Sequence, residues 1–498
     1  MTGAYVYVDF GAVRIQQYLA RTPGLRGHRA ASNNLARATA AASILEVIGD
    51  LAEVNPEAGR ADGVVSVRFP AAEGGCEERV RRLQERMFAH LRRALPGAEF
   101  QSVWGEGESY LAVYAHILQP KVRRGQVRHD LPPSAEFPLA VPCRMCHVDP
   151  AVGVEPVPDG LLALCLDCSR RNVPRRQAVA DTRSPEGQLL QDIGLAPAPD
   201  SFTDLAALGS AASGRNHLAT VAVDGNAFGL FFKALADEGG QDARLREAKA
   251  SISTALSLAT RAALANAALE LPLTVEREQL CVVPHVVGGD DVLVSLPADQ
   301  AWWFTLTFLK EFERLVRKET AEVLDQLNEL RVGRAGLPAL EAPTASAGVV
   351  FARASHPLNL LVESAGMRLS EAKAAFRGRQ ASVHWLDITA DGAEYPGHPP
   401  VALHLLRNGD GGATAAAAAL SRLVEVPASH RARLTEALRG SGPLTAAALA
   451  DRVGHLDAIR PFLPPLNRID QLDQIGQPSV SGIGLGAALN LARWWPCA

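Results

Sequence analysis

The sequence contains no apolar run long enough to cross a membrane. A transmembrane helix needs about 20 consecutive apolar residues, whereas the most apolar helical candidate, Ser251 to Leu271, is interrupted by Arg261. The N-terminus also lacks the basic segment and apolar core of a signal peptide, because the strand-like alternation YVYVDF begins at Tyr5. These absences favour a cytoplasmic protein without membrane contact.

Cysteine and surplus charge are also scarce. The sequence has seven cysteines, four of them in two C-x2-C pairs, which fits a reducing compartment better than a disulfide framework. With 50 basic and 54 acidic residues the formal net charge is -4, so any contact with nucleic acid must be local. The composition is globular, with 47% hydrophobic and 21% charged residues, and 498 residues are too many for one hydrophobic core.

A hairpin with paired carboxylates stands at the centre of the second half. In HVVGGDDVLVSL two β-branched runs flank Gly288, Gly289, Asp290 and Asp291. This Gly/Asp connection predicts a β-hairpin with a tight turn and two carboxylates at its tip. Such carboxylates can hold the two divalent cations, roughly 3.5 to 4 Å apart, of phosphoryl-transfer enzymes. An ordinary solvated turn is the alternative.

The elements around this hairpin predict a ferredoxin-like fold. A strand ends at Asp224, a helix broken at Gly239-Gly240 covers about 228–271, and the two hairpin strands follow. A long amphipathic helix is expected over 299–330, a strand at TASAGVVFA, a helix over 358–377 and a strand at ASVHWLDI. In this β-α-β-β-α-β topology the first strand lies beside the hairpin strands, so Asp224 should lie near Asp290 and Asp291.

A third carboxylate favours a metal site over a solvated turn. Three carboxylates supply the hard oxygen ligands that magnesium prefers, and Asn226 and the carbonyl of Gly225 could complete the ligand set. Lys373, on the following helix, could reach a triphosphate, although a solvated surface lysine is the alternative. Phe228 could stack on a base, with packing as the alternative.

The first half repeats the pattern without the carboxylate pair. A strand at 5–10, helical sequence interrupted at Pro23-Gly24, a second strand VVSVRF, a helix over 77–95, and strands at AEFQSVWG and SYLAVYAH predict an α+β sandwich with helices on one face. After VVSVRF, where a catalytic pair would lie, the segment from Pro70 to Gly75 has no paired aspartates. We therefore expect this half to be chemically silent.

Two cysteine pairs predict a zinc module between the halves. The spacing C-x2-C-x18-C-x2-C supplies four thiolates, which close the tetrahedral shell of a structural zinc ion; four unrelated thiols are the alternative. His147 could replace one ligand, although a surface residue beside the site is the favoured alternative. Nearby arginines could contact RNA phosphates or form a solvated surface. The predicted ligands are Cys143, Cys146, Cys165 and Cys168, and the arginines are Arg144, Arg170, Arg171, Arg175 and Arg176.

The remaining sequence completes the domain organisation. Residues 187–215, rich in Pro, Ala, Ser and Gly, predict a linker with at most one short helix. The Ala- and Leu-rich C-terminal part predicts helices over 413–423, 430–438 and 444–453 and shows no chemical motif. We therefore predict a first domain over 1–135, a zinc module over 136–186, a linker over 187–215, a second domain with the GGDD site over 216–395, and a helical domain over 396–498.

Four segments in order resemble the second palm domain of the large subunit of type III CRISPR effector complexes. They are DGNAFG from Asp224, VVGGDDVLVSLP from Val286, SAGVVFARASHPL from Ser346 and EAKAAFRGRQASVHW from Glu371. In that family a cysteine-pair zinc module separates two palm domains and a helical domain follows, an order similar to the one here over nearly the whole chain. Asn226 departs from the pattern, because an aspartate is common at its position.

The resemblance implies an enzyme that polymerises ATP into cyclic oligoadenylate second messengers in antiviral defence. It implies that Asp224, Asp290 and Asp291 bind two Mg²⁺ or Mn²⁺ ions and that Lys373 contacts the triphosphate. It also implies small effector subunits and guide or target RNA as partners. The nuclease domain often found at the N-terminus of the family is expected to be absent, because the sequence begins at the first palm and His129-Asp130 is an isolated pair.

Two other functions remain open. The chain could be mainly a structural subunit of an RNA-guided ribonucleoprotein, with its basic zinc region against RNA or protein partners. It could also be a free-standing defence nucleotide cyclase with another trigger and other products. A diguanylate cyclase is disfavoured, because such an enzyme needs neither a second palm nor a zinc module.

Overall fold

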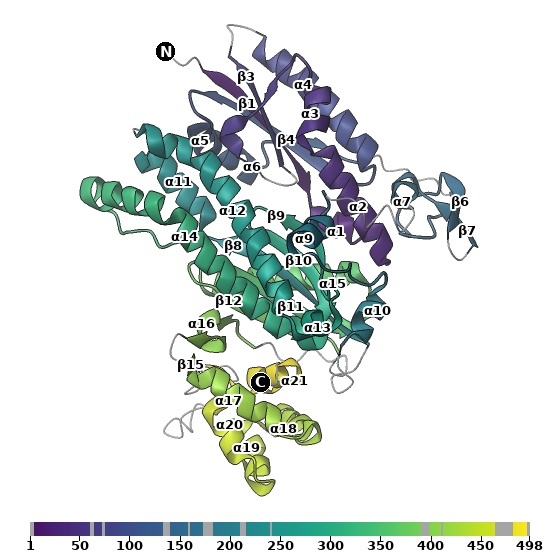
Figure 1. The fold of residues 1–498 in the computed structure, drawn as a ribbon, viewed down its shortest axis with the longest axis vertical. Coiled ribbons are helices and arrows are strands. Elements are labelled where there is room, and N and C mark those ends of the chain that lie inside the picture. Colours follow the sequence, from purple (N-terminus) through teal and green to yellow (C-terminus); the bar gives the residue numbers. More distant parts are fainter. Residues whose placement is uncertain are drawn as a thin grey trace.

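The computed structural model describes residues 4–59, 64–71, 75–132, 140–157, 160–172, 183–209, 216–239, 242–389, 398–409, 412–463 and 482–495. Two α+β units and a helical unit follow one another along the long axis, and a small cysteine module projects from the side of the first unit (Figure 1). Within these ranges no helix is both long and apolar enough to cross a membrane. The predicted α+β class is confirmed.

The first unit is built on an antiparallel sheet with the strand order β2-β3-β1-β4-β5. The central strand β1 (Tyr5–Val13) pairs with β3 (Val64–Pro70) on one side and with β4 (Glu99–Gly107) on the other. The short strands β2 (Glu53–Val54) and β5 (Arg128–Asp130) form the edges. This is the ferredoxin-like order extended by β5, which carries the isolated pair His129-Asp130.

Helices cover both faces of this sheet, not one face as predicted. Val8 and its alternate neighbours on β1 pack against a layer of helices, whereas Tyr7 packs against the turns on the opposite face. The first layer is formed by α1 (Ile15–Leu19), α2 (Leu25–Ala38), α3 (Ala41–Ile48) and α4 (Cys76–Ala94), and the opposite face is covered by α5 (Tyr110–Val113), the π-helical turn η2 (Tyr114–Leu118) and α6 (Gln119–Arg123).

The strand predicted at SYLAVYAH is wrong, because this segment is helical. Its buried side chains, Tyr110, Leu111 and Val113, follow helical spacing, and the Ser109 hydroxyl accepts the N–H of Ala112 at 3.4 Å. Aromatic and β-branched residues in so short a run fit a strand and a helix equally well. The N-cap serine was the sequence signal in favour of the helix.

The segment from Pro70 to Gly75 does not correspond to the GGDD turn. It follows β3, whereas a GGDD-like hairpin would join β2 to β3 at the opposite end of the sheet. Residues 55–59 of that hairpin loop include the 3-10 turn η1 (Pro56–Ala58) and contain no aspartate. Residues 60–63 of the loop and 72–74 of the predicted segment lie outside the described residues. That the first unit has no catalytic activity of its own stays a prediction.

The segment after the cysteine module packs into the core. It contains two helices, α9 (Pro185–Ile193) and α10 (Phe202–Ala207), where the sequence predicts at most one. Leu189 and Leu205 are buried in the core of the second unit. Arg29 of α2 binds both carboxylate oxygens of Glu186 at 2.6 and 2.7 Å. Residues 210–215 of the predicted linker, like Arg175 and Arg176, lie outside the described residues.

The second unit contains a six-stranded sheet in the order β13-β12-β11-β8-β10-β9. Strands β8, β9, β10 and β11 form the predicted ferredoxin-like core, and β12 adds to it in parallel with β11. The short strand β13 pairs with the far edge of β12. The strands are β8 (His217–Asn226), β9 (Val283–Gly288), β10 (Asp291–Pro297), β11 (Thr344–Arg353), β12 (Ser382–Asp387) and β13 (Val401–Ala402).

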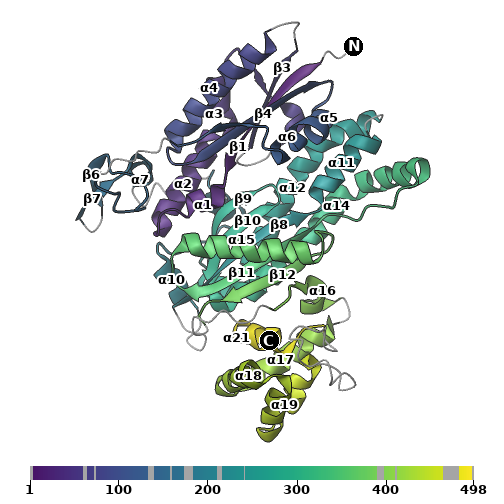
Figure 2. The same ribbon diagram turned by 180° about the vertical axis from the view of Figure 1, so that it is seen from behind.

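Helices pack on both faces of this sheet as well. The buried aromatic residues Trp302, Phe308 and Phe312 join α14 to one face, together with α11 and α12. On the other face lies α15 (Figure 2). It approaches the sheet closely at Gly348, where a Cβ would lie 2.1 Å from the carbonyl oxygen of Ala365. The helices are α11 (Phe228–Gly239), α12 (Ala243–Leu269), α13 (Pro272–Arg277), α14 (Ala301–Ala335) and α15 (Leu358–Ala375).

The C-terminal unit is helical, as predicted. The indole N–H of Trp494 on α21 donates to Asp387 at 2.8 Å, and Trp385 donates to Asn490 at 2.7 Å, so this last helix, which the sequence analysis did not predict, joins the unit to β12. The elements are α16 (Leu403–Leu406), a small hairpin of β14 (Asn408–Gly409) and β15 (Gly412–Ala413), α17 (Ala415–Glu425), α18 (Ala428–Ser441), α19 (Pro443–Arg452), α20 (Leu456–Ile459) and α21 (Leu485–Trp494).

Candidate active site and cysteine centre

The GGDD sequence forms a tight turn between β9 and β10. Gly288 at the end of β9 pairs with Asp291 at the start of β10. The first central residue, Gly289, has a φ of +60°, whereas Asp290 is not among the described residues with positive φ. Glycine is favoured at this first position because it adopts left-handed backbone angles without steric cost. The predicted hairpin is confirmed, with Asp290 and Asp291 at its tip.

Strand β8 brings a third carboxylate to the same place. The antiparallel register of β8 and β10 pairs Val223 with Val292. One step further along both strands, Asp224 therefore lies opposite Asp291. The predicted juxtaposition of the three aspartates is what the sheet register produces, although the residues are far apart in the sequence.

Gly225 makes room for the carboxylate of the turn. A Cβ at this position would lie 2.4 Å from Asp290 Oδ2 and 2.5 Å from the ring of Phe228. Real Cβ atoms do not approach other atoms so closely, and packed neighbours give way only at a cost. A glycine is therefore required if Asp290 is to point toward β8.

The three carboxylates perturb one another. Burial raises the pKa of Asp290 to about 6 and that of Asp291 to about 8, and repulsion from Asp224 adds to both shifts. The positive charge of Lys373 acts in the opposite direction on both groups. Carboxylates held close together and out of water favour a bound cation, because only a positive charge relieves both the repulsion and the loss of hydration.

Lys373 supplies a positive charge in this arrangement. It lies in the last turn of α15, and its Nζ donates to Asp224 Oδ2. The two side chains remain 27% and 35% exposed, so each can exchange this partner for a dissolved ion. The three aspartates are more widely spaced than the cysteines. Among the described residues, only the four cysteines form a group of at least three metal-ligating side chains whose ligand atoms lie within 4.8 Å of one another.

Two residues of the predicted site, Asn226 and Phe228, are engaged in internal packing. The amide nitrogen of Asn226 donates to the hydroxyl groups of Thr344 at 3.0 Å and Ser346 at 2.9 Å, and the residue is 1% exposed. The Phe228 ring is buried and packs edge-on against Phe312 at 6.4 Å. The role of Asn226 as a metal ligand and that of Phe228 in base stacking stay predictions, and these contacts favour a structural role for both.

Two hydroxyl groups outside the predicted set reach the hairpin. The Thr260 hydroxyl of α12 donates to the Gly289 carbonyl at 2.5 Å, and the Ser32 hydroxyl of α2 donates to the His285 carbonyl on β9 at 3.1 Å. Both residues are buried. Helical periodicity can predict that these positions are buried, but it does not predict which strand each of them contacts.

The four cysteines of the two C-x2-C pairs converge. Their sulfur atoms lie within 4.8 Å of one another and all four residues are buried. The N–H of Met145 donates to Cys143 and that of Cys168 donates to Cys165, both at 3.4 Å. His147 is exposed and lies outside the group. Four thiols with backbone donors directed at two of them fit a closed tetrahedral zinc site.

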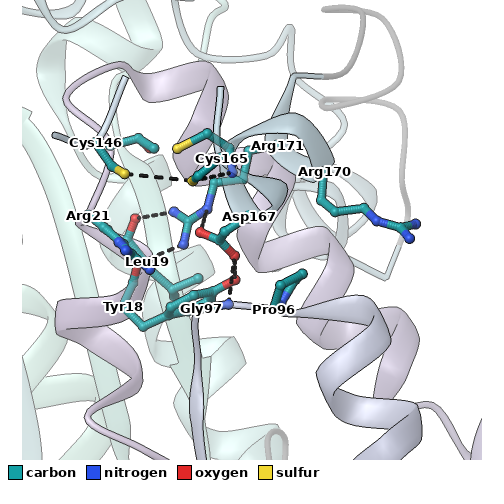
Figure 3. Close-up of polar contacts among 12 residues, drawn as sticks. Tyr18, Leu19, Arg21, Pro96, Gly97, Cys146, Cys165, Asp167, Arg170 and Arg171 are labelled. Carbon is teal, nitrogen blue, oxygen red and sulfur yellow. Dashed lines mark hydrogen bonds and ion pairs between the residues drawn. The ribbon is translucent and has the colours of Figure 1, made fainter. Parts of the chain in front are cut away.

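Helix α7 (Leu166–Arg171) anchors this module to the first unit (Figure 3). Arg171 forms a 2.8 Å ion pair with Asp167, and the two side chains are 1% and 2% exposed. Arg171 also donates to the carbonyls of Tyr18 at 2.9 Å and Leu19 at 3.1 Å, and the Tyr18 hydroxyl donates to Asp167 at 2.5 Å. The neighbouring Arg170 points away from this network (Figure 3). The module also contains the hairpin of β6 (Gly153–Val157) and β7 (Gly160–Leu164).

Comparison with known proteins identifies the part of the chain that carries the carboxylates. Residues 217–382 match the family model described as Cas10/Cmr2, second palm domain. This segment is a Cas10/Cmr2 second palm domain. It extends from the start of β8 to the start of β12, so it includes Asp224, the GGDD hairpin and Lys373.

Solved structures extend the likeness of fold beyond the second palm domain. An apo Csm1-Csm4 cassette matches with a TM-score of 0.57 and 15% identity, covering 98% of this chain and 70% of that chain. Csm1 in T. onnurineus matches with a TM-score of 0.53 and 14% identity, covering 99% and 69%. A Csm1-Csm4 cassette in complex with cA4 gives 0.52 and 13%, covering 98% and 69%. No curated protein matches this sequence.

The carboxylates of the GGDD turn should contribute less to the stability of the metal-free protein as the pH rises. The folded-state pKa values of Asp290 and Asp291, about 6 and about 8, lie above the ordinary value of 3.8. The fold therefore favours the protonated carboxyls, and this contribution is complete below about pH 4 and is lost as the pH rises through the two folded pKa values. Thermal unfolding of chelator-treated protein between pH 4 and 9 should show this decline relative to an Asp290→Asn, Asp291→Asn variant. The comparison is needed because burial lowers the pKa values of His285, His384 and His398 to about 3, 4 and 4, so these groups add stability as the pH rises toward 6.5.

Two comparisons check this pH prediction. Asp290→Asn with Asp291→Asn should gain stability relative to the parent chain as the pH rises, because the amides do not titrate. Manganese should oppose it and bind more tightly at higher pH, because the ligands must be deprotonated. An identical pH dependence in the double variant and the parent chain would contradict the assignment of the shifts to these carboxylates.

Proposed function

We propose that the chain is a nucleotidyltransferase that polymerises ATP into cyclic oligoadenylates. The proposal is carried by the convergence of Asp224, Asp290, Asp291 and Lys373 at one end of the sheet in a Cas10/Cmr2 second palm domain. The solved relatives support the choice of substrate, because Csm1-Csm4 cassettes of similar fold are described in complex with AMPPNP, pppApA and cA4.

The three aspartates and the Gly225 carbonyl would hold two divalent cations. The donor set fits Mg²⁺ or Mn²⁺, since all ligands are hard oxygen atoms and the pKa values of Asp290 and Asp291 are raised, to about 6 and about 8, by burial and mutual repulsion. Bound cations lower the pKa of a ribose 3′-hydroxyl and neutralise the charge that develops on the leaving pyrophosphate. A zinc ion in the cysteine group would have a structural role, because four thiolates leave no position for a substrate.

The residues of the chain position the reacting groups. The 3′-hydroxyl releases its proton to water, its oxygen forms a bond to the α-phosphorus, the bond from that phosphorus to the bridging oxygen breaks, and pyrophosphate leaves. Lys373 can exchange Asp224 for a triphosphate oxygen, because both partners are partly exposed. The hairpin and β8 fix the carboxylates before substrate binds, and such positioning supplies most of the catalysis in phosphoryl transfer. The first unit would form the other wall of the nucleotide pocket.

The decisive test is identification of the product. The purified chain is incubated with each of the four ribonucleoside triphosphates and Mg²⁺ or Mn²⁺, with and without RNA and a co-expressed Csm4-type subunit, and products are identified by mass spectrometry. Linear or cyclic oligoadenylates formed from ATP support the proposal. Products from another base would replace ATP as the substrate, and no product in any mixture would overturn the enzymatic proposal.

A second function, docking of a protein partner, is favoured by the surface of the cysteine module. On its hairpin, Val154 and Pro156 share one face with Leu161, because Pro156 pairs with Leu161 and alternate residues share a face. Val154 is 65% and Leu161 71% exposed. The opposite face carries Glu155 and Leu162, and Leu162 packs against the cysteines. Apolar side chains gathered on an exposed face are typical of a surface that binds another protein.

Charges on the module indicate an acidic protein as the occupant. Within the described part, Asp149 contacts Arg21 and Glu155 accepts from Ser169 and Asn172. The anion of Asp167 is buried against Arg171, whereas the side chains of Arg144 and Arg170 are exposed. The described module has no Phe, Tyr or Trp, which disfavours single-stranded RNA, because such RNA stacks its bases on aromatic rings.

We therefore infer that this face binds an effector subunit with an apolar surface bordered by carboxylates, in the cytoplasm. Val154→Glu with Leu161→Glu should reduce copurification of a co-expressed Csm4-type subunit at least about tenfold, a loss of roughly 1.4 kcal/mol. Leu230→Glu on α11, which is 59% exposed in the parent chain, is the matched control. Unchanged copurification would overturn this docking surface, and loss of RNA binding alone would replace the protein with RNA.

A further inference from the structure

Helix α12 lies between the first unit and the GGDD hairpin (Figure 1). It contacts the turn η1 of the first unit and also strand β9, which leads into the GGDD turn. The glycine at the end of this contact, Gly59, has no space for a side chain, because a Cβ would lie 2.6 Å from the carbonyl oxygen of Ala250 on α12. The first unit and α12 are therefore packed backbone against backbone.

Near the middle of α12, Thr260 reaches the GGDD turn. Its hydroxyl oxygen lies 2.5 Å from the Gly289 carbonyl oxygen and 2.9 Å from that of Leu256 on its own helix, and the residue is 0% exposed. The Leu256 carbonyl is also the normal acceptor of a backbone N–H in the helix. Removing the hydroxyl would therefore cost the Gly289 carbonyl more than the Leu256 carbonyl, which keeps its backbone donor. Gly289 is joined directly to Asp290, so this hydrogen bond acts next to the carboxylate.

On the same face of α12, Lys249 reaches the first unit. It precedes Thr260 by about three helical turns of 3.6 residues. Its ammonium group lies 3.4 Å from the Ala58 carbonyl oxygen and 4.6 and 4.5 Å from the ring centroids of Tyr110 and Tyr114. The side chain crosses from one unit to the other, and the residue is 6% exposed.

A carboxylate that attracts Lys249 without a direct hydrogen bond lies on the strand that corresponds to β8. Asp9 lies on β1, which is central in the first sheet as β8 is in the second, and it faces Ser66 on β3 where Asp224 faces Asp291. Tyr110 donates its hydroxyl to Asp9 at 2.8 Å. Burial lowers the pKa of Lys249 to about 8, and attraction to Asp9 and Glu57 opposes that shift.

We propose that Lys249 and Thr260 are positioning residues, through which the first unit fixes the GGDD turn. Lys249 anchors α12 to the Ala58 carbonyl and the aromatic rings of the first unit, and Thr260 on the same face holds the Gly289 carbonyl. This inference rests on the proposed nucleotidyltransferase function. If the proposal is correct, the first unit contributes to catalysis by positioning the turn. Its own Asp9 does not take part directly, because this carboxylate accepts from Tyr110 and attracts Lys249.

The arrangement makes the position of the turn depend on the first unit. An α-helix rises about 1.5 Å per residue, so the two contacts lie roughly 16 Å apart along a stiff element. A shift of the first unit that moves Lys249 along the helix axis moves Thr260 by a similar amount. Small displacements at carboxylate ligands matter, because productive geometry must be held within about 0.5 Å.

The test compares variants that remove or keep the two contacts. Thr260→Val keeps the shape and removes the donor, and Thr260→Ser keeps the donor. Lys249→Met removes the charge and Lys249→Arg keeps it. Thr305→Val on α14 is the matched control, because Thr305 is also 0% exposed and its hydroxyl donates to its own helix at 2.7 Å. The readouts are kcat, KM for ATP, thermal stability, and calorimetric binding of Mn²⁺ with AMPPNP.

Thr260→Val should lower kcat roughly 10- to 100-fold, a loss comparable with that of a group that orients a metal ligand, because Gly289 directly precedes Asp290. It should also weaken Mn²⁺ binding, while KM for ATP changes less than about threefold. Thr260→Ser should restore most of kcat. Lys249→Met should act in the same direction, and the combined variant should lose less than the product of the two effects, because the residues act through one helix.

Three results would overturn the proposal. The first is a Thr260→Val variant that equals Thr305→Val in kcat and in Mn²⁺ binding. The second is a Thr260→Ser variant as impaired as Thr260→Val. The third is full additivity of Lys249→Met and Thr260→Val. Binding of Mn²⁺ is measured without turnover, so a chain that makes no product would refute the proposed reaction and still test the positioning of the turn.

Discussion

Replacing both Asp290 and Asp291 by alanine is expected to lower oligoadenylate formation by at least about a thousandfold. Two of the three carboxylates that would hold the cations lie at the tip of one hairpin, so both are lost together. Asp224 alone, paired with Lys373, supplies too few oxygen ligands for two divalent cations. The measurement is the rate of product formation at saturating ATP and Mn²⁺.

The same change should not unfold the protein. Asp290 and Asp291 are held against Asp224 with raised pKa values, about 6 and about 8, which means that their charged forms oppose folding near neutral pH. The metal-free double variant should therefore be at least as stable as the parent chain at pH 8. Asp325→Ala with Glu329→Ala, two exposed carboxylates on α14, is the control for loss of charge.

Activity and stability together decide the interpretation of this variant. Loss of product with an unchanged or higher melting temperature would assign a catalytic role to the carboxylates. Loss of product together with unfolding would assign them a structural role. Undiminished synthesis would remove the GGDD turn from the reaction altogether.

Arg171→Met is expected to lower the free energy of unfolding by about 3 to 5 kcal/mol, the usual cost of leaving one partner of a buried ion pair uncompensated. Arg171 is 1% exposed, and its loss would strand the Asp167 carboxylate in the interior. The carbonyls of Tyr18 and Leu19 would lose their donor at the same time. Urea unfolding at constant pH measures the change.

The neighbouring residue supplies the matched control. Arg170 is exposed and points away from the network (Figure 3), so Arg170→Met should change the unfolding free energy by no more than about 0.5 kcal/mol. Adding Asp167→Asn to Arg171→Met should recover part of the loss, because the uncompensated charge is then removed. Equal effects of the two arginine variants would show that α7 does not anchor the module.

Removal of zinc should resemble Arg171→Met. Cys165 precedes α7 and Cys168 lies on it, so a metal bound by these thiolates fixes the helix that carries Asp167 and Arg171. The purified chain should contain about one zinc per molecule, and Cys165→Ser with Cys168→Ser should lose it and destabilise the first unit. Cys76→Ser, outside the cysteine group, is the control. A chain without zinc that is equally stable would contradict this role.

Local sequence pattern was sufficient for the ferredoxin-like core. β-branched runs around GGDD predicted β9 and β10, and helical periodicity predicted α14 and α15, because side chains that face one core recur with the period of the element. The C-x2-C spacing predicted the convergence of four cysteines, because each pair can present two sulfurs to one side. In these places the chemistry that fixes the structure lies within a few residues.

Prediction was wrong where tertiary contacts decide between local alternatives. SYLAVYAH has the composition of a strand, but its Tyr110 side chain packs against Tyr7 on the second face of the first sheet and the segment is helical. Residues 187–209 have the composition of a linker, but Leu189 and Leu205 are buried in the second unit. In both segments the partner that determines the structure is distant in sequence.

The sequence by itself determined which chemical groups can act in this protein: the GGDD carboxylates, Asp224, Lys373 and the four thiols. Their types and spacing predict cation and phosphate chemistry, and the β-α-β-β-α-β order places the first strand beside the hairpin. Only the tertiary structure decided that Asn226 is held by Thr344 and Ser346, and that Thr260 and Lys249 join the GGDD turn to the first unit. The physical reason is that a hydrogen bond across 29 or more residues depends on how helices pack, and periodicity predicts which face is buried but not which partner it meets.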